Sequence, residues 1–129
     1  MTAPATGIYR TLRMRIAKVE LGRARIEAEP DAEQAGFPTS RGPIVHGGAV
    51  ATIADSALAC AAGTLAEEGN VPTTVDLRVE FFRTGRPGQI TADAEVRHRT
   101  RRLAYCAATV RQNGEVIAEA RATVAYVAR

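Results

Sequence analysis

Residues 46–63, HGGAVATIADSALACAAG, are apolar on nearly every side of a helix, and Asp55 is the only acid among them. A helix with one apolar stripe lies on a sheet, but a helix that is apolar all round has to be enclosed. The positions that leave almost no solvent-facing side are Val50, Ile53, Ala54, Ala57, Leu58, Cys60, Ala61 and Leu65. The rest of the chain is therefore expected to wrap around this helix.

The segments on both sides of the helix alternate apolar and polar residues, as half-buried strands do. Residues 13–28 indicate two short strands around a turn at Gly22, and a loop rich in turn-forming residues follows at 30–43. Two later segments are expected to point alternate side chains inward: Val75, Leu77, Val79 and Phe81 in one, and Ile90, Ala92, Ala94 and Val96 in the other. The first of these places Thr74, Asp76, Arg78 and Glu80 on the opposite face.

The C-terminal segments flank Asn113 and Gly114, a dipeptide that favours a tight hairpin turn. The expected order is thus two strands, one helix and four strands. A chain of 129 residues, 46% of them hydrophobic, is enough for one domain and too short for two. We predict a single α+β domain over residues 1–129, with an antiparallel sheet of five to six strands wrapped around one long central helix. This is the hot-dog fold, and residues 1–8 are expected to be flexible.

Several classes of function are disfavoured by composition. Cys60 and Cys106 have no neighbouring Cys or His that would complete a metal site, so they are expected to be small buried hydrophobes, with no metal and no cofactor. No signal segment opens the chain, and no apolar run reaches the roughly 18 residues of a membrane span, which predicts a cytoplasmic protein without membrane contact. Trp is absent and aromatic residues make up 5%, so stacking on nucleic-acid bases is not expected.

VHGGAVATIAD, followed by TTVDLRVEFFRTGRPG, resembles the acyl-CoA thioesterases of the hot-dog superfamily, in the PaaI-like branch of phenylacetate degradation. The resemblance covers residues 44–129, and its most specific element is HGG with an acid nine residues after the histidine. It implies that the Gly47 N–H binds the thioester carbonyl and that Asp55 acts as base or nucleophile. A hydroxyl on the next strand helps to hold water in that family.

Thr74 matches this hydroxyl best, with neighbouring Thr73 as the fallback. Relatives often carry Asn or Gln six residues before the histidine as a second carbonyl donor. In this chain Ser40 occupies that position, so it contacts the carbonyl through a water or the second donor is missing.

The same chemistry follows from the residues themselves. Thioester hydrolysis needs donors for the oxygen that becomes negative, and a base or nucleophile. Gly47 and Gly48 begin a helix, where backbone N–H groups are unpaired and accessible. Asp55 lies in the third turn, beyond any capping role, so its burial needs an explanation: catalysis, or an ion pair with an arginine or at a subunit interface. His46 has three candidate roles: it orients the substrate, polarises the carbonyl, or holds the loop by hydrogen bonds.

Gly47 and Asp55 are eight residues apart, which is about 12 Å along a helix. They cannot both touch one carbonyl. If two such helices pack antiparallel about a two-fold axis, the aspartate of each approaches the glycine end of the other. The spacing therefore predicts a homodimer with two shared sites, and the resemblance implies that dimers pair into a homotetramer.

The net charge of +3 comes from 17 Lys and Arg residues, of which only Lys18 is a lysine. Arginine binds phosphate through a planar fork of donors, which suits the nucleotide of coenzyme A. A solvated strand edge is the competing explanation for such clusters. The candidate phosphate contacts are Arg83 and Arg86 in one cluster, and Arg97, Arg99, Arg101 and Arg102 in the other.

The expected substrate is a coenzyme A thioester with an aryl-acetyl, aromatic or medium-chain acyl group. Two other classes remain open. One is a non-catalytic acyl-CoA sensor on the same fold, against which Asp55 argues. The other is a hot-dog hydratase or dehydratase, which would need an Asp and His pair that His46 does not supply at the expected spacing.

Overall fold

The computed structural model describes residues 6–129 and consists of one six-stranded antiparallel sheet wrapped around one long helix, α3 (Gly47–Gly63). The strand order is β1-β2-β6-β7-β8-β5, so β1 and β5 are the two edges. The strands are β1 (Arg15–Glu20), β2 (Arg23–Ala28), β5 (Asn70–Phe81), β6 (Ile90–Arg99), β7 (Leu103–Gln112) and β8 (Glu115–Ala128). The predicted architecture is confirmed.

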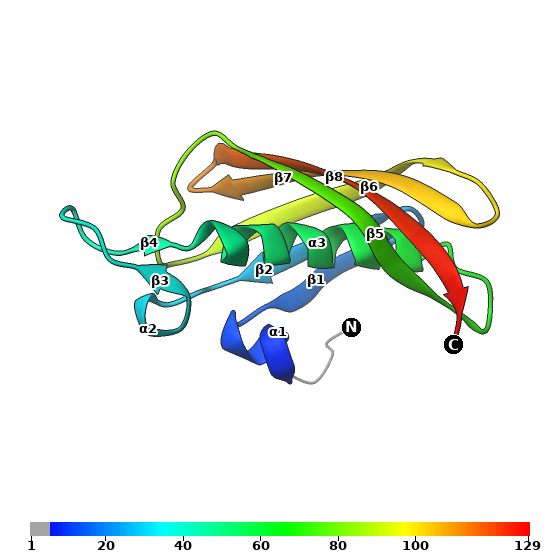
Figure 1. The fold of residues 1–129 in the computed structure, drawn as a ribbon, viewed down its shortest axis with the longest axis horizontal. Helices are drawn as coiled ribbons and strands as arrows, with labels where there is room; N and C mark the ends of the chain where they lie inside the picture. The colour runs from blue at the N-terminus through cyan, green and yellow to red at the C-terminus, as the bar shows by residue number, and fades with distance from the viewer. Residues whose placement is uncertain (1–5) are drawn as a thin grey trace.

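Four short elements complete the chain. They are α1 (Gly7–Thr11), α2 (Ala32–Ala35), β3 (Gly36–Phe37) and β4 (Ile44–Val45). The segment 30–43, expected as a loop, therefore contains α2 and β3. The β3–β4 pair forms its own small sheet, and its connecting loop projects beyond the N-terminal end of α3 (Figure 1). Of the predicted flexible segment, residues 1–5 lie outside the described residues, whereas Gly7 and Ile8 belong to α1.

The two predicted hairpin turns have the backbone angles that their residues favour. Gly22, between β1 and β2, has φ +76°. Asn113 and Gly114, between β7 and β8, have φ +52° and +78°, as a two-residue hairpin turn requires. Both turns confirm the predictions made from their sequences.

The core lies between α3 and the sheet and is built largely of alanine and branched aliphatic residues. On α3, Val50, Ile53, Ala54, Ala57, Leu58 and Ala61 are buried, as predicted. They face the fully buried Ile26, Ile90, Val110 and Val124 of the sheet, together with alanines of β6, β7 and β8. The short side chains let helix and sheet approach closely, which large residues on both layers would prevent.

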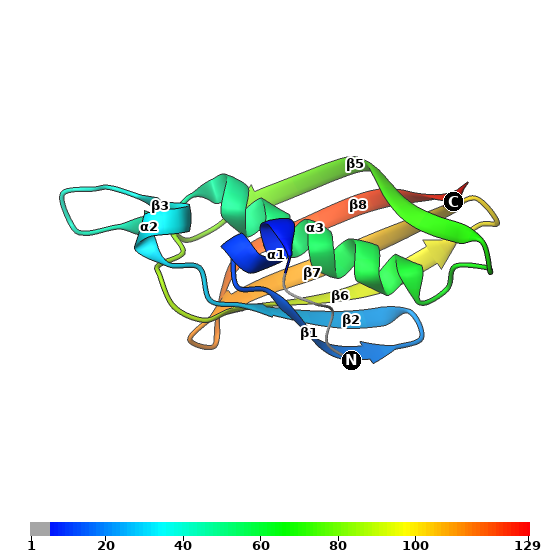
Figure 2. The ribbon, with the colours of Figure 1, turned by 90° about the horizontal axis from the view of Figure 1, so that it is seen from below.

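The expectation that α3 is enclosed on every side is wrong for the single chain. Thr52, Asp55, Ser56, Ala59 and Cys60 are only half-buried, because the sheet covers one side of the helix. Figure 2 shows α1 lying across part of the side that the sheet leaves open. Leu65, expected in the core, lies beyond the helix end and is also half-buried. A half-covered strip of small and polar side chains therefore runs along α3.

Strand β5 departs from the predicted alternation. A bulge falls between Thr74 and Asp76, where Thr74 pairs with Val124 and Asp76 with Thr123. Val75 is the extra residue and is 59% exposed, so its expected inward position is wrong. Leu77 and Phe81 lie on the helix side but stay 36% and 52% exposed, since β5 is an edge strand. In β6, by contrast, Ile90, Ala92 and Ala94 are buried and Val96 packs on the core, as predicted.

Within residues 6–129, no helix combines the length and the apolar character needed to cross a membrane.

The fully buried Leu58 gives a test of the helix–sheet core. Leu58→Ala should destabilise the fold by about 2–5 kcal/mol, because it removes buried methyl groups and leaves a cavity. Leu21→Ala, at a side chain that is 80% exposed, is the matched control and should change the free energy of unfolding by no more than about 0.5 kcal/mol. Urea unfolding of both variants measures the difference, and equal effects would contradict the placement of Leu58 in the core.

Candidate functional site

Asp55 lies in the middle of α3, on the half-covered strip, and is held by Thr74 of β5. The Thr74 hydroxyl donates a hydrogen bond of 2.8 Å to Asp55 Oδ1. No arginine or lysine of residues 6–129 forms an ion pair with Asp55, so the alternative of an ion pair within the chain receives no support. The carboxylate is thus oriented through one oxygen, and among residues 6–129 no hydrogen-bond partner is seen for the other oxygen.

The structure brings Thr74, and not Thr73, to Asp55. Thr73 pairs with Ala125 and is exposed, whereas Thr74 is half-buried. Thr74 reaches the helix side because of the bulge at Val75. Strict alternation from Leu77 would have placed it on the outer face with Asp76 and Arg78.

The other predicted catalytic group lies at the first turn of α3. His46 is the N-cap, and its Nδ1 accepts a hydrogen bond of 2.9 Å from the Gly48 N–H. The geometry therefore favours the loop-holding role of His46. The same hydrogen bond occupies the N–H of Gly48, which was predicted to contact the substrate. The Gly47 N–H has no acceptor within residues 6–129, and Gly47 is exposed. Gly47 is accordingly the donor that a carbonyl oxygen can reach.

Within one chain these two groups remain apart. Gly47 and Asp55 lie on the same unbroken helix, so eight residues separate them by about 12 Å. A thioester carbonyl within about 3 Å of one cannot contact the other. Each chain thus holds both halves of a site but does not join them.

A hollow of about 290 Å³ opens beside Gly47. A Cβ on Gly47 would lie 3.5 Å from the ring of Phe81, which forms part of this hollow. Arg83, a predicted phosphate contact, also lines it and forms an ion pair of 3.2 Å with Glu115. Ser40 is exposed in the projecting loop between β3 and β4. Phe81 was predicted only as a core residue, because the alternation of apolar and polar residues along a strand does not indicate contact with the end of a helix.

Three of the other predicted arginines, Arg99, Arg101 and Arg102, gather at the opposite end of α3. Arg101 and Arg102 line a hollow of about 330 Å³ with Glu67, Asn70 and Tyr126. The Arg99 guanidinium lies 4.8 Å from the centre of the Tyr126 ring, and its buried Nε has no hydrogen-bond partner. Tyr126 in turn donates a hydrogen bond of 2.7 Å to the Ala62 carbonyl, which ties this cluster to the C-terminal end of the helix.

Tyr9 of α1 adds a group that the sequence did not reveal. Its hydroxyl lies 3.8 Å from the Cys60 sulfur, over the strip that carries Asp55. Burial raises the pKa of Tyr9 to about 12, and the Cys60 thiol and the charge of Asp55 add to the rise, while a hydrogen bond with Ser56 opposes it. Tyr9 lies in a segment expected to be irregular, and no periodicity there predicts its contact with α3.

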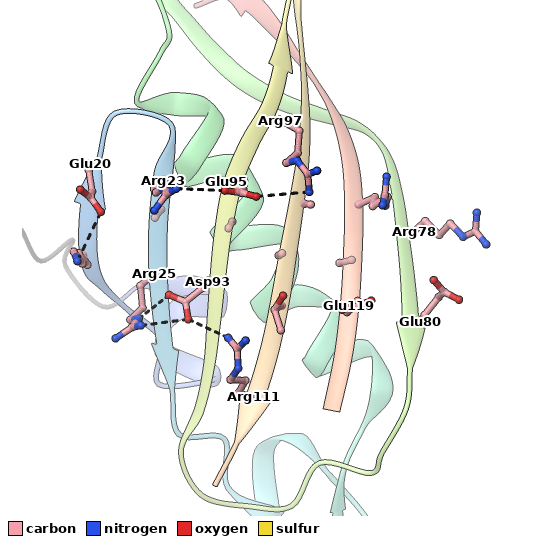
Figure 3. Close-up of a pocket in the computed structure, with 18 residues that line it drawn as sticks. Glu20, Arg23, Arg25, Arg78, Glu80, Asp93, Glu95, Arg97, Arg111 and Glu119 are labelled. Carbon is pink, nitrogen blue, oxygen red and sulfur yellow. Dashed lines mark hydrogen bonds and ion pairs between the residues drawn. The ribbon is translucent and has the colours of Figure 1, made fainter. Parts of the chain in front are cut away.

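A hollow of about 560 Å³, larger than the two described above, lies on the outer face of the sheet, away from α3 (Figure 3). Its walls are charged and largely neutralised by ion pairs such as Arg25–Asp93 at 2.7 Å and Arg23–Glu95 at 3.7 Å. Arg97, another predicted phosphate contact, is paired with Glu95. None of Gly47, Asp55 and Thr74 lines this hollow, so size alone does not mark the site.

In residues 6–129 no three His, Cys, Asp or Glu side chains are grouped for a metal.

One long helix wrapped by one antiparallel sheet is the arrangement of the hot-dog fold. The sequence profile of the Thioesterase superfamily matches residues 42–119. The chain belongs to the thioesterase superfamily, and it is a thioester hydrolase.

Solved structures share this fold over nearly the whole chain. A thioesterase family protein from Silicibacter pomeroyi is 29% identical, with a TM-score of 0.84 over 96% of this chain and 91% of that chain. A phenylacetic acid degradation-related protein from Ralstonia eutropha JMP134 is 24% identical, with a TM-score of 0.84 over 95% and 92%. The E. coli PaaI protein from the phenylacetic acid degradation operon is 22% identical, with a TM-score of 0.80 over 92% and 83%. The comparison with curated proteins gave no match.

The two cysteines give a test of the packing next to the site. Burial raises the pKa of Cys106 to about 11 and also raises the pKa of Cys60. The thiolate is the reactive form, so in the native protein at pH 8 Cys106 should react about 100-fold more slowly with a disulfide reagent than in denaturant, and Cys60 should also react more slowly. The rate should rise as the pH approaches 11. Fast labelling at pH 8 in Cys60→Ala, which leaves Cys106 alone, would contradict its burial.

Proposed function

We propose that the chain hydrolyses coenzyme A thioesters in a homodimer with two shared sites, each joining Asp55 of one copy to Gly47 of the other. The observation that carries this proposal is the separation of the two groups on one helix, about 12 Å, together with their orientation. Thr74 fixes the Asp55 carboxylate, and the Gly47 N–H is free. No structural role accounts for the carboxylate at mid-helix or for the free N–H. Antiparallel pairing of two copies joins them.

In the general-base route, Asp55 takes a proton from a water that attacks the thioester carbon. The negative charge moves to the carbonyl oxygen, which the partner's Gly47 N–H stabilises. The tetrahedral intermediate then expels the coenzyme A sulfur, which leaves as the thiol after taking up the proton. In the nucleophilic route, the carboxylate oxygen itself bonds to the carbon and coenzyme A leaves as the thiolate. Water then cleaves the resulting anhydride into the free acid and the regenerated Asp55 carboxylate, and the thiolate takes up the proton that is released. Thr74 supports both routes, since it fixes Asp55 through one oxygen.

The shared arrangement also accounts for two arginine clusters at opposite ends of α3. In an antiparallel pair of helices, the Arg101 and Arg102 end of one copy lies toward the Arg83 end of the other. The phosphates of coenzyme A can then contact arginines that are distant within one chain. Arg99, stacked on Tyr126, is the positioning member of its cluster.

The acyl group proposed is aryl-acetyl, aromatic or medium-chain, and the likeness to the Ralstonia and E. coli proteins of phenylacetic acid degradation supports this choice. Pairing of dimers into a homotetramer, and a cytoplasmic location, stay predictions.

Release of free coenzyme A thiol from a panel of aryl-acetyl, benzoyl and medium-chain thioesters tests the function. Binding without thiol release would indicate a sensor, and hydration of an unsaturated acyl chain would indicate a hydratase.

Substitutions at the carboxylate and its partner test the catalytic roles. Asp55→Asn should keep the fold and lower kcat by about 10²–10⁴, as expected when a positioned base is lost. Thr74→Ala should cost less, because it removes one hydrogen bond to Asp55. Thr73→Ala, the matched control one residue away, should leave kcat unchanged. Unaltered hydrolysis by Asp55→Asn, or a larger loss in Thr73→Ala than in Thr74→Ala, would refute these roles.

A mixed dimer tests the shared site itself. Asp55→Ala and Gly47→Val, each inactive alone, are unfolded and refolded together. In a mixed dimer one site combines intact Gly47 with intact Asp55, and the other carries both lesions. Random pairing makes about half of the dimers mixed, so activity per subunit should recover to roughly a quarter of the wild-type value. Mixed dimers that are present but inactive would show that each chain carries its own complete site.

A further inference from the structure

Tyr9 lies along one side of the half-covered strip of α3, and Asp55 lies along the other. Asp55 faces β5, where it accepts the hydrogen bond from Thr74. Each residue of a helix is turned by about 100° from the one before it, so Cys60 points about 140° away from Asp55. The Tyr9 hydroxyl is 3.8 Å from the Cys60 sulfur. The Tyr9 side chain therefore borders the strip on the side away from β5.

Between these two sides the surface of α3 carries small residues. Ala59 and Gly63 follow Asp55 by four and eight residues, so they continue the same face of the helix, and both are half-buried. Pro72 of β5 closes the far end, since a Cβ on Gly63 would lie 3.3 Å from its ring. The strip from Asp55 to Gly63 therefore has a floor of small residues, with β5 on one side and Tyr9 on the other.

The structure holds Tyr9 in this position. Leu12 and Met14, core residues that follow it closely, are 3% and 4% exposed. The Met14 N–H donates a hydrogen bond of 2.8 Å to the Tyr9 carbonyl, and the Tyr9 side chain packs against the core. Figure 2 shows α1 lying across α3. Because the backbone next to Tyr9 is anchored, its ring is a fixed boundary of the strip.

The proposed shared site leaves one direction open to the acyl group. Ala51 is midway between Gly47 and Asp55, so a two-fold axis that joins Asp55 of one copy to Gly47 of the other passes close to Ala51. The partner's helix begins at its own Gly47, opposite Asp55, so it covers the strip only as far as Asp55. An acyl group whose carbonyl is bound there therefore extends toward Ala59, where α1 is the covering element.

The position of Tyr9 along the helix sets a length for that acyl group. Cys60, which Tyr9 contacts, is five residues after Asp55, and this is about 7.5 Å along the helix. An extended acyl chain grows by about 1.3 Å per carbon, given C–C bonds of about 1.5 Å, so roughly six carbons beyond the carbonyl span this distance. A phenylacetyl group spans roughly 5–6 Å by the same bond lengths. A decanoyl chain, at about 12 Å, would have to pass Tyr9 and reach Gly63.

We infer that Tyr9 determines the acyl specificity of the proposed site: its ring closes the acyl pocket about 7.5 Å beyond Asp55, so that phenylacetyl and hexanoyl groups fit and a decanoyl group does not. The inference rests on the proposed function, and it narrows the acyl class to a single aromatic ring or a chain of about six to eight carbons. Tyr9 acts by contact with the end of the acyl group and takes no part in the bond changes at the carbonyl.

Chain-length kinetics test this role. In the wild type, kcat/KM for decanoyl-CoA should be at least about tenfold below that for hexanoyl-CoA, because the extra methylenes overpack the pocket. Tyr9→Ala should raise the decanoyl-to-hexanoyl ratio at least about tenfold, since it removes the ring that ends the pocket. Tyr9→Phe keeps the ring and should leave the ratio within about threefold of wild type. Ile8→Ala, at a 50% exposed side chain of the same helix, is the matched control and should leave the ratio unchanged.

A purely structural role for Tyr9 gives a different result. It would lower kcat/KM equally for both thioesters in Tyr9→Ala, and an unchanged ratio in that variant overturns the inference. Ala59→Leu fills the floor of the strip without altering α1, so it keeps the test valid if Tyr9→Ala fails to fold. It should lower kcat/KM for hexanoyl-CoA at least about tenfold and for acetyl-CoA less than about threefold. Equal losses for the two thioesters would show that the acyl chain does not lie over Ala59.

The Cys60 thiol gives a readout that needs no hydrolysis. In an Asp55→Asn, Cys106→Ala background, N-ethylmaleimide can label only Cys60. Adding Tyr9→Ala should speed this labelling at least about tenfold, because the side chain that covers the sulfur is gone. Decanoyl-CoA should then slow the labelling at least about fivefold, whereas with Tyr9 present it should change the rate less than about twofold. Absence of this protection in the Tyr9→Ala protein overturns the inference.

The outcomes separate this inference from the proposed function. Protection of Cys60 by decanoyl-CoA only when Tyr9 is removed, but no thiol release by the wild type from any thioester, would refute the function and support the role of Tyr9. Thiol release with the same decanoyl-to-hexanoyl ratio in wild type and Tyr9→Ala would refute the role of Tyr9 and support the function. Neither thiol release nor protection refutes both.

Discussion

One extra residue in β5 sets the direction of the Thr74 side chain, and the candidate site depends on it. Counted back from Leu77 by strict alternation, Thr74 would lie on the outer face of the sheet with the charged side chains of that strand. The bulge at Val75 turns Thr74 to the helix side, where it meets Asp55 at 2.8 Å. A bulge costs ladder hydrogen bonds and leaves a residue unpaired, and Val75 is accordingly 59% exposed. The irregular pairing of β5 therefore gives the Asp55 carboxylate a fixed orientation.

The partial covering of α3 gives this carboxylate its setting. A fully enclosed, unpaired aspartate would be strongly disfavoured as a charged group, whereas a fully exposed one would be surrounded by water and poorly directed. Asp55 is half-buried, with aliphatic core on one side and a strip of small residues on the other. Tyr9 of α1 covers the strip toward the C-terminal end of the helix, where its hydroxyl lies 3.8 Å from the Cys60 sulfur. The side of the helix that the sheet leaves open is thus partly apolar and still accessible.

The features predicted correctly from sequence are those that one segment determines by itself. The apolar positions of α3, the alternation of β6 and the Asn113–Gly114 turn each follow from local periodicity or backbone preference. The features that were missed depend on distant segments. The place of β5 beside β8 at an edge exposes Leu77 and Phe81, and the contact of Phe81 with Gly47 joins segments 34 residues apart. Likewise, the packing of α1 on Cys60 has no local signal, since a five-residue helix is fixed by what it contacts.

The proposed two-fold arrangement gives a physical reason for Gly47 and Asp55 to share one helix. A rigid helix holds the two groups at a constant separation, so in the proposed dimer one symmetric contact between two copies sets the geometry of both sites together. Strand β5 contacts both groups, through Thr74 at one end and Phe81 at the other. The fixed separation along α3 is therefore as much a requirement of the proposed site as the carboxylate itself.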